Sequence, residues 1–235
     1  MGGASGLNTV RGQARQQDKG QLRYNWLTER SIRSTVAAEW GVSRSRNRTR
    51  RRFDPMKQEV TTYYLEILDP EEFTPSEKEL PDLEIREAEI ACAKLGRFLY
   101  TTVGRDWGWT DRLNWPRAKW LAHLERREVE MWIAHLHGVI AGYVELESQP
   151  EKSVEIVCFG LLPQFLGQGI GSVFLSDTVE RTFRGGARRI WLHTCSLDSP
   201  RAMENYGARG FKLFDEKTTL EDVPSLPSDQ DAWKA

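Results

Sequence analysis

Short segments rich in β-branched and aromatic residues recur along the chain, several with alternating apolar and polar positions, and this pattern predicts β-strands. Strands are expected over residues 60–68, 128–135, 139–147, 154–162, 188–194 and 211–214. Residues 154–162 are largely apolar, which favours a central place in a sheet. His137-Gly138 is typical of a hairpin turn, and Gly142 inside the following strand indicates a bulge or a close approach of another backbone.

Other segments carry apolar residues at intervals of three and four, which is the spacing of an amphipathic helix. Helices are predicted over residues 84–103, 116–124, 169–183 and 199–208. The connection from Leu162 through a helix to Arg188 is a crossover between parallel strands. The order of elements therefore predicts an α/β fold, in which a mixed central β-sheet is covered by helices on both faces.

Charge divides the chain into two parts that differ in kind. Residues 1–55 hold 12 Lys and Arg against 4 Asp and Glu, whereas residues 56–235 hold 21 against 30. The first part has few large apolar residues and cannot bury enough surface to offset its ordering entropy. We expect a disordered basic extension over 1–55, one domain over 56–219, and a flexible tail over 220–235, where Pro, Ser and Asp gather.

Three interpretations of the basic extension remain open. It is a tail that touches nucleic acid or an anionic surface, an organelle transit peptide, or a stretch translated from a misplaced start codon. The ordered pattern begins almost immediately after Met56, which favours the third interpretation. A basic run by itself is more often a solvated tail than a specific binding site.

Several classes of protein are excluded by composition. No apolar run approaches the roughly 20 residues that cross a bilayer, and the N-terminus lacks the apolar core of a secretory signal. We therefore expect a cytoplasmic protein.

Cys92, Cys158 and Cys195 are odd in number and widely spaced, which predicts buried free thiols. They share no metal-ligand spacing with the four histidines, so we expect no metal site.

A glycine-rich loop follows the predicted central strand and opens a helix. Gly167, Gly169 and Gly171 alternate with other residues, which lets backbone N–H groups converge beside the positive end of the helix dipole. Such a site suits a pyrophosphate. The loop is not a Walker loop, because no Gly-Lys-Ser/Thr follows, and its spacing differs from the dinucleotide fingerprint.

The motif Gln164-x-x-Gly167-x-Gly169 resembles the Arg/Gln-x-x-Gly-x-Gly/Ala signature of the GNAT N-acetyltransferase superfamily. Downstream, Ala202-x-x-x-Tyr206-x-x-x-Gly210-Phe211 is similar to the closing helix and strand of that family. The resemblance extends over residues 60–217, and it is firmest from residue 128 onward. Ser199 stands where many members have Asn, and Ser is an equally good helix N-cap.

This resemblance implies a site for acetyl-CoA, with the backbone of Leu161 and Leu162 along the pantetheine arm and the loop N–H groups on the pyrophosphate. The implied cofactor-binding residues are Leu161, Leu162, Gln164, Gly167, Gln168, Gly169, Ile170, Gly171 and Ser172. It also implies direct transfer of the acetyl group, without an acyl-enzyme. Cys158 and Cys195 have no neighbouring base or helix start, so neither is expected to act as a nucleophile.

Two residues are candidates for catalysis. Glu155 lies in an otherwise apolar strand that leads to the loop, where a carboxylate is suited to accept a proton, and a glutamate at the matching place is the base in the histone-acetyltransferase branch. Tyr206 matches the family tyrosine that acts as general acid. The alternatives are a solvent-facing or ion-paired Glu155 and a Tyr206 that only packs beside Phe211.

The segment 106–115 is unusually aromatic and falls where variable helices of the family shape the acceptor pocket. Trp107, Trp109 and Trp115, with Asp106 and Asp111 interleaved along the segment, suit a cationic amine through cation–π contact and ion pairing. The alternative is that these tryptophans pack the helix layer. Glu145 and Glu147 on a neighbouring strand are candidates for further negative charge.

These observations predict an N-acetyltransferase that moves the acetyl group of acetyl-CoA to a primary amine of a small cationic molecule. Protein N-termini or lysines are the nearest alternative acceptors. A noncatalytic acyl-CoA sensor or a nucleic-acid binder that uses the basic extension is the alternative from another class. We expect a small-molecule amine as partner and neither a membrane nor nucleic acid, while a homodimer stays open.

Overall fold

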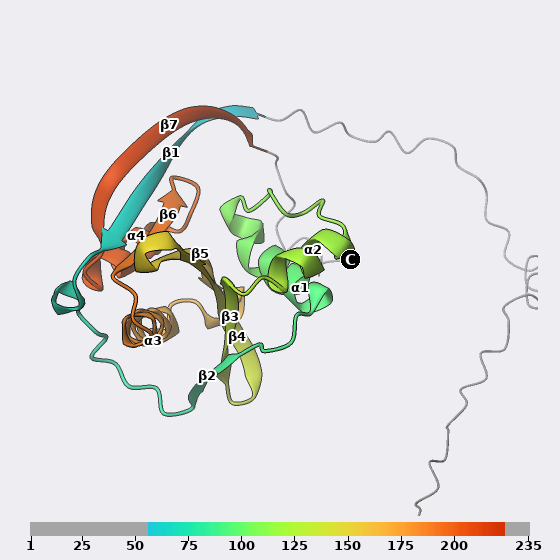
Figure 1. Cartoon of the computed structure of the whole chain (residues 1–235). Helices are drawn as coiled ribbons and strands as arrows, with labels where there is room; N and C mark the ends of the chain where they lie inside the picture. Colours follow the sequence, from blue (N-terminus) through green and yellow to red (C-terminus); the bar gives the residue numbers. More distant parts are fainter. Residues whose placement is uncertain (1–55, 224–235) are drawn as a thin grey trace, which may run out of the picture. The chain divides into compact units, whose positions relative to one another are not determined.

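A computed structural model describes residues 56–223, and the predicted extension over 1–55 lies outside them, as do residues 224–235. The described part contains one seven-stranded sheet in the order β2-β3-β4-β5-β6-β1-β7 (Figure 1). Neighbouring strands are antiparallel except β5 and β6, which are parallel. The predicted crossover through a helix is confirmed, since α3 connects these two strands.

The sheet is built from β1 (Met56–Ile67), β2 (Leu83–Glu87), β3 (Val129–Leu136), β4 (Val139–Gln149), β5 (Ser153–Leu161), β6 (Arg189–Cys195) and β7 (Lys212–Val223). The α-helices are α1 (Ala93–Gly104), α2 (Arg117–Leu124), α3 (Ile170–Arg184) and α4 (Pro200–Ala208). The predicted strands and the last three predicted helices are therefore confirmed, with shifted ends. The predicted hairpin turn is also present, with positive φ at His137 and Gly138.

The helix predicted over residues 84–103 is wrong in its first half. Leu83 and Ile85 are partly buried whereas Glu84 and Arg86 are exposed, and this alternation belongs to β2, which pairs with the edge of β3. The helix begins only at Ala93. Apolar residues on the strand and on the helix together imitate a helical period, and pairing with β3 decides between the two structures.

The last strand runs much further than the predicted 211–214. Residues 220–223 pair with residues 56–59 of β1, so they belong to the sheet and not to a flexible tail. This end of the β1–β7 ribbon is largely exposed, and its polar residues carry no hydrophobic alternation that would reveal a strand. Figure 1 shows the ribbon curving away from the centre of the sheet.

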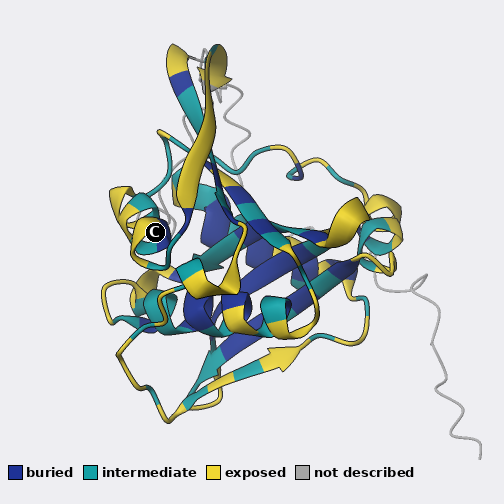
Figure 2. Ribbon diagram, turned by 60° about the vertical axis from the view of Figure 1, so that its left-hand side comes forward, coloured by how far each residue is buried: buried dark blue, intermediate teal, exposed yellow. Residues whose placement is uncertain are grey.

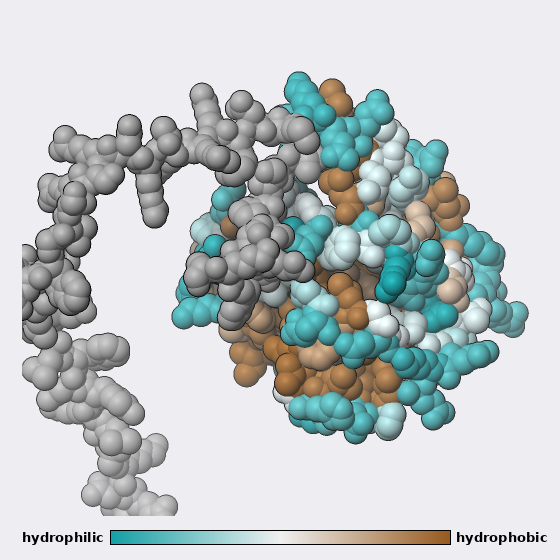
Figure 3. Space-filling view, turned by 180° about the vertical axis from the view of Figure 1, so that it is seen from behind, coloured by the Kyte–Doolittle hydropathy of each residue, from teal (hydrophilic) through white to brown (hydrophobic). Residues whose placement is uncertain are grey.

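Two hydrophobic clusters lie on opposite faces of the sheet, so helices cover both faces as predicted (Figure 2). Phe174, Leu175 and Val179 of α3 pack on one face with Tyr206 of α4. The other face is covered by residues of α1 and α2: Leu99, Tyr100, Val103 and Trp120. On the surface, apolar side chains interrupt an otherwise polar exterior, as the view from behind shows (Figure 3).

Strands β5 and β6 separate before they end, which leaves a gap in the sheet. The pairing of β5 with β6 ends at Ile156 and Leu192, although both strands continue. Next to this point β5 carries one extra residue, Val157, opposite β4, and such a bulge bends a strand. The predicted close approach at Gly142 is confirmed, because a side chain there would collide with the Gly160 carbonyl and Leu161. Within residues 56–223, no helix is long and apolar enough to span a bilayer.

Candidate active site

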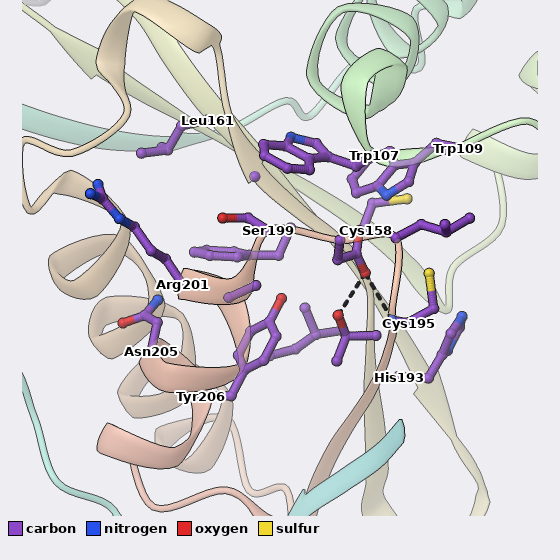
Figure 4. A pocket seen from close by; sticks show the side chains of 18 of the residues that line it. Trp107, Trp109, Cys158, Leu161, His193, Cys195, Ser199, Arg201, Asn205 and Tyr206 are labelled. Carbon is purple, nitrogen blue, oxygen red and sulfur yellow. Dashed lines mark hydrogen bonds between the residues drawn. The ribbon is translucent and has the colours of Figure 1, made fainter. Parts of the chain in front are cut away.

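A cavity of about 820 Å³ lies where β5 and β6 separate. Its walls come from segments far apart in sequence, namely β5, β6, the start of α3, α4, the loop after α1, and the β1–β7 ribbon. In the close-up, Arg201 and Asn205 lie at one end, Trp109, His193 and Cys195 at the other, and Tyr206 between them (Figure 4). The cavity therefore joins the glycine loop to the aromatic segment.

The glycine loop forms one end of the cavity through Gly167, Gly169, Gly171 and Ser172. Gly167 and Gly169 have φ of 75° and 80°, which residues with a side chain rarely adopt. Gly169 is the N-cap of the 15-residue helix α3. The backbone N–H groups of the first helical turn, which have no partner within the helix, therefore lie at this end of the cavity. Left-handed glycines followed by a helix start form a cradle for an anion, as a pyrophosphate requires.

The predicted cofactor residues divide into two groups. Leu161 and the glycines with Ser172 line the cavity, whereas Leu162, Gln164, Gln168 and Ile170 do not. Ile170 is buried in the core beneath the loop, and the Gln168 side chain donates to the Gln164 carbonyl at 2.8 Å. The Leu162 N–H donates to the Ala141 carbonyl at 2.8 Å. Because N–H groups of a strand face alternate edges, the N–H of Leu161 faces the edge that β6 leaves open.

Three further residues at this end were missed by the sequence analysis. Arg201 lines the cavity beside Gly167, and Asn205 lines it while donating to the Gly171 carbonyl at 3.3 Å. Lys78 donates to the Gln168 carbonyl and lies against Gly169. Arg201 and Asn205 lie one turn apart on α4, the helix that carries Tyr206. Their spacing of four residues is the sequence signal that could have placed them on one face of this helix. No sequence signal places the loop of Lys78 over α3.

Tyr206 lies in the middle of the cavity wall, almost fully buried between Phe159 and Phe211, with ring centroids 6.4 and 6.0 Å away. Figure 4 shows its hydroxyl directed into the cavity. Burial raises the pKa of Tyr206, and the charge of Asp198 adds to the effect. The phenol therefore keeps its proton near neutral pH, and it can give that proton but cannot serve as a base.

Glu155 does not line the cavity. Its side chain is only 14% exposed and lies behind His193, whose Nδ1 is 3.4 Å from Glu155 Oε1. Gln149 donates to the other carboxylate oxygen at 2.9 Å. His193 does line the cavity, and its contact with Glu155 raises its pKa above 6.5 although burial opposes this. His193 is absent from the residues that the sequence predicts for the site, because nothing in its local pattern marks it.

At the opposite end from the glycine loop, Trp107, Trp109 and Asp111 line the cavity, whereas Asp106 is exposed and does not. Trp109 also packs on Tyr100, with ring centroids 5.5 Å apart. Packing and pocket formation, which the sequence left as alternatives, are therefore combined in one side chain. Trp115 is partly buried and packs against the core beside Trp120, at a centroid distance of 5.2 Å.

A buried charge cluster supports this wall. Arg112 Nη1 lies 2.9 Å from both oxygens of Glu145, and His123 Nε2 is 2.9 Å from Oε1. Burial works to raise the pKa of Glu145, but the hydrogen bond with His123 and the charge of Arg112 outweigh it and lower the pKa. Glu147 pairs with Arg126 at 2.7 Å. Neither glutamate is thus free to attract a ligand, contrary to the expectation from the sequence.

Cys158 and Cys195 both line the cavity. Burial raises the pKa of Cys158 to about 12, and it also raises that of Cys195. Both thiols therefore stay protonated at neutral pH, which argues against a nucleophilic cysteine. In the part of the chain that the structure describes, no group of three or more His, Cys, Asp or Glu side chains is placed to hold a metal ion.

The model of the acetyltransferase (GNAT) family matches residues 85–211, which is more than half of the chain. The chain belongs to the GNAT family. Members are acetyl-CoA-dependent acyltransferases that bind an acyl-CoA and an acceptor, and the matched region includes the glycine loop, Glu155 and Tyr206. No curated protein matches the chain.

Two solved structures with TM-scores of 0.50 and 0.51 agree with this chain in fold. A GCN5-related N-acetyltransferase from Kribbella flavida is 17% identical with a TM-score of 0.50, covering 69% of this chain and 58% of that one. Another, from Sphaerobacter thermophilus, is 17% identical with a TM-score of 0.51, covering 72% and 53%. PaiA N-acetyltransferase from Thermoplasma acidophilum, solved with coenzyme A, is 18% identical with a TM-score of 0.47, covering 58% and 99%. The chain thus spans less than two thirds of the first two proteins.

The residues present fit the acyl-CoA that GNAT enzymes bind. The left-handed glycines and the start of α3 provide N–H donors for a pyrophosphate, and Arg201 and Lys78 place positive charge beside them. The open edge of β5 provides unpaired backbone groups at Leu161 for an amide-containing arm. The anion cradle and the open strand edge are adjacent. A long ligand that carries both a pyrophosphate and an amide-containing arm requires this arrangement.

Proposed function

We propose that this chain transfers the acetyl group of acetyl-CoA directly to the primary amine of a small cationic molecule. One observation carries the proposal: a single cavity joins an anion cradle, a buried tyrosine and an aromatic wall with carboxylates. In this proposal the cofactor end is formed by the glycine loop, Leu161, Arg201 and Asn205. Acetyl-CoA bound there would supply the acetyl group as a thioester.

Tyr206 is the proposed general acid. Its hydroxyl lies between the two ends of the cavity, and burial keeps the proton on the oxygen until a leaving sulfur accepts it. Glu155 is proposed to act in removing the proton of the acceptor ammonium, which must be lost before nitrogen can attack. Its carboxylate lies behind His193 and outside the cavity wall, so it acts on this proton through a neighbouring side chain.

The charges at the acceptor end support a cationic substrate. Asp111, Asp198 and Glu221 line the cavity, as do the rings of Trp107 and Trp109. The positive charge of Arg112 in the same wall is neutralised by Glu145. Carboxylates and aromatic faces together attract an ammonium group through ion pairing and cation–π contact.

The proposal is tested by thiol release from acetyl-CoA over a panel of polyamines, aminoglycosides, amino acids and peptides, with wild type beside Tyr206→Phe. Turnover of a small polycationic amine, lowered in the variant while coenzyme A still binds, supports it. Turnover of peptides alone would replace the small acceptor with a protein N-terminus or lysine. Binding of coenzyme A without turnover of any amine would favour a sensor, and no binding at all would overturn the proposal.

A further inference from the structure

A hydrogen-bonded chain of side chains holds Glu155 in one orientation behind the cavity. The Trp191 indole N–H donates to Gln149 Oε1 at 3.0 Å, and Gln149 Nε2 donates to Glu155 Oε2 at 2.9 Å. Because the indole nitrogen can only donate, it determines which end of the Gln149 amide faces the carboxylate. One oxygen of Glu155 is thus occupied, and the other, Oε1, is left facing His193.

His193 lies between that carboxylate and the cavity. On β5, Glu155 is in register with Trp191 of β6, and His193 follows two residues later on the same face. Its Nδ1 is 3.4 Å from Glu155 Oε1, and the side chain is 46% exposed. A carboxylate at Nδ1 retains the proton on that nitrogen, so Nε2 carries the lone pair. Tyr64 and Trp191 flank the ring, with centroids 6.0 and 6.4 Å away.

We propose that His193 is the residue that accepts the proton of the acceptor ammonium, with Glu155 as its positioning residue. The inference rests on the proposed function and deepens it. One N–H bond of the ammonium breaks, its electron pair stays on nitrogen, and the proton forms a new bond to Nε2 of the neutral imidazole. The resulting imidazolium is stabilised by the Glu155 carboxylate, which itself stays ionised, and the amine is left with the lone pair needed for attack.

The charges around His193 suit this role. Glu155 faces it from β5, Asp198 from the turn after β6, and Asp111 from the loop between α1 and α2. These three carboxylates raise the pKa of His193, Glu155 most strongly, while burial lowers it. From β1 it faces Tyr64, with which it is in register. The raised pKa makes the neutral imidazole of His193 a stronger acceptor for the proton of an ammonium group.

The test compares the pH dependence of kcat/KM in wild type, His193→Gln and Glu155→Gln. In wild type we expect the rate to rise with pH through the pKa of His193, because only neutral imidazole accepts a proton. His193→Gln should lose this rise and about 100-fold in kcat. Glu155→Gln should keep the rise but move it to lower pH, since the carboxylate that raises the pKa is gone. His137→Asn at the hairpin turn serves as control and should behave like wild type.

A second measurement separates this inference from the proposed function. The ring of His193 is titrated by NMR in the protein without substrates, and its midpoint should fall in Glu155→Gln. An unchanged midpoint, or an amine acetylated by His193→Gln at the wild-type rate, overturns the inference. Loss of the rise in Glu155→Gln with its retention in His193→Gln would make Glu155 the direct acceptor. If wild type acetylates no amine while the midpoint still falls, the proposed function is what has failed.

Discussion

Gly104 and Trp109 meet directly where α1 ends and the acceptor wall begins. The Trp109 N–H donates to the Gly104 carbonyl at 3.1 Å, and the indole lies where a side chain on Gly104 would be. The absence of a side chain therefore lets a tryptophan turn back over the helix end and reach the cavity, which it lines. Packing of a helix terminus and the shape of a binding wall are coupled through this pair.

Gly104→Ala should therefore damage acceptor binding and leave the cofactor end unchanged. The added methyl overlaps the indole of Trp109, and overpacking of this kind typically costs about 1–3 kcal/mol. We expect the acceptor KM to rise about tenfold with coenzyme A affinity unchanged. Gly207→Ala is the matched control, because that helical glycine has open space around it. Steady-state kinetics with both substrates varied makes the measurement, and an unchanged acceptor KM would contradict it.

At the other end of the cavity, Gly169→Ala should weaken coenzyme A binding. Its φ of 80° is unfavourable for alanine, and the methyl would lie 2.6 Å from Lys78 Nζ. We expect an increase of about tenfold in the dissociation constant by calorimetry. Gly186→Ala carries a similar backbone strain, with φ of 94°, but lies outside the cavity with no atom near the methyl. Equal weakening in both variants would show that the cradle has no special role.

Glu145→Gln should lower the free energy of unfolding by about 3–5 kcal/mol, because it leaves Arg112 buried without its counter-charge. Urea unfolding at neutral pH measures this loss. Glu147→Gln is the control, since its partner Arg126 is 40% exposed and surface pairs contribute about 0–1 kcal/mol. Similar losses in the two variants would contradict the assigned difference between a buried and a surface pair.

The same ion pair predicts how stability depends on pH. The folded-state pKa of Glu145 is lowered from its ordinary 4.5, so the unfolded state binds its proton first as pH falls. The stabilisation by Glu145 is therefore complete above pH 4.5 and is lost as pH falls through the lower folded-state pKa. Wild type should lose more stability than Glu145→Gln between pH 6 and pH 3, as thermal melts over that range would record. Parallel curves would show that Glu145 is not responsible.

Tyr206→Phe removes one oxygen from the cavity wall and should lower kcat by about 100-fold while the KM values stay close to wild type. Tyr143→Phe is the control, because the Tyr143 side chain is almost fully buried in the core and does not line the cavity. That variant should keep full activity. If Tyr206→Phe also keeps its kcat, Tyr206 is a packed aromatic and the proton for the leaving sulfur has another source.

Local chemistry determined much of what the sequence revealed. The glycine loop can be recognised from the sequence because the left-handed backbone conformation of Gly167 and Gly169 favours glycine. The spacing between this loop and Tyr206 pointed to the family. Most strands and helices were predicted because burial of one face imposes a period on neighbouring residues. These features depend on residues close in sequence.

Only the tertiary structure decided the remaining features, because they depend on which distant segments become neighbours. Pairing with β3 turned residues 83–87 into a strand, and pairing with β1 extended β7 to Val223. From the sequence, Glu145 is an exposed strand residue. In the structure it is buried, because Arg112 and His123 pack around its carboxylate. Likewise, no local pattern reveals that His193 stands between Glu155 and the cavity, since two strands separated by a crossover helix place them there.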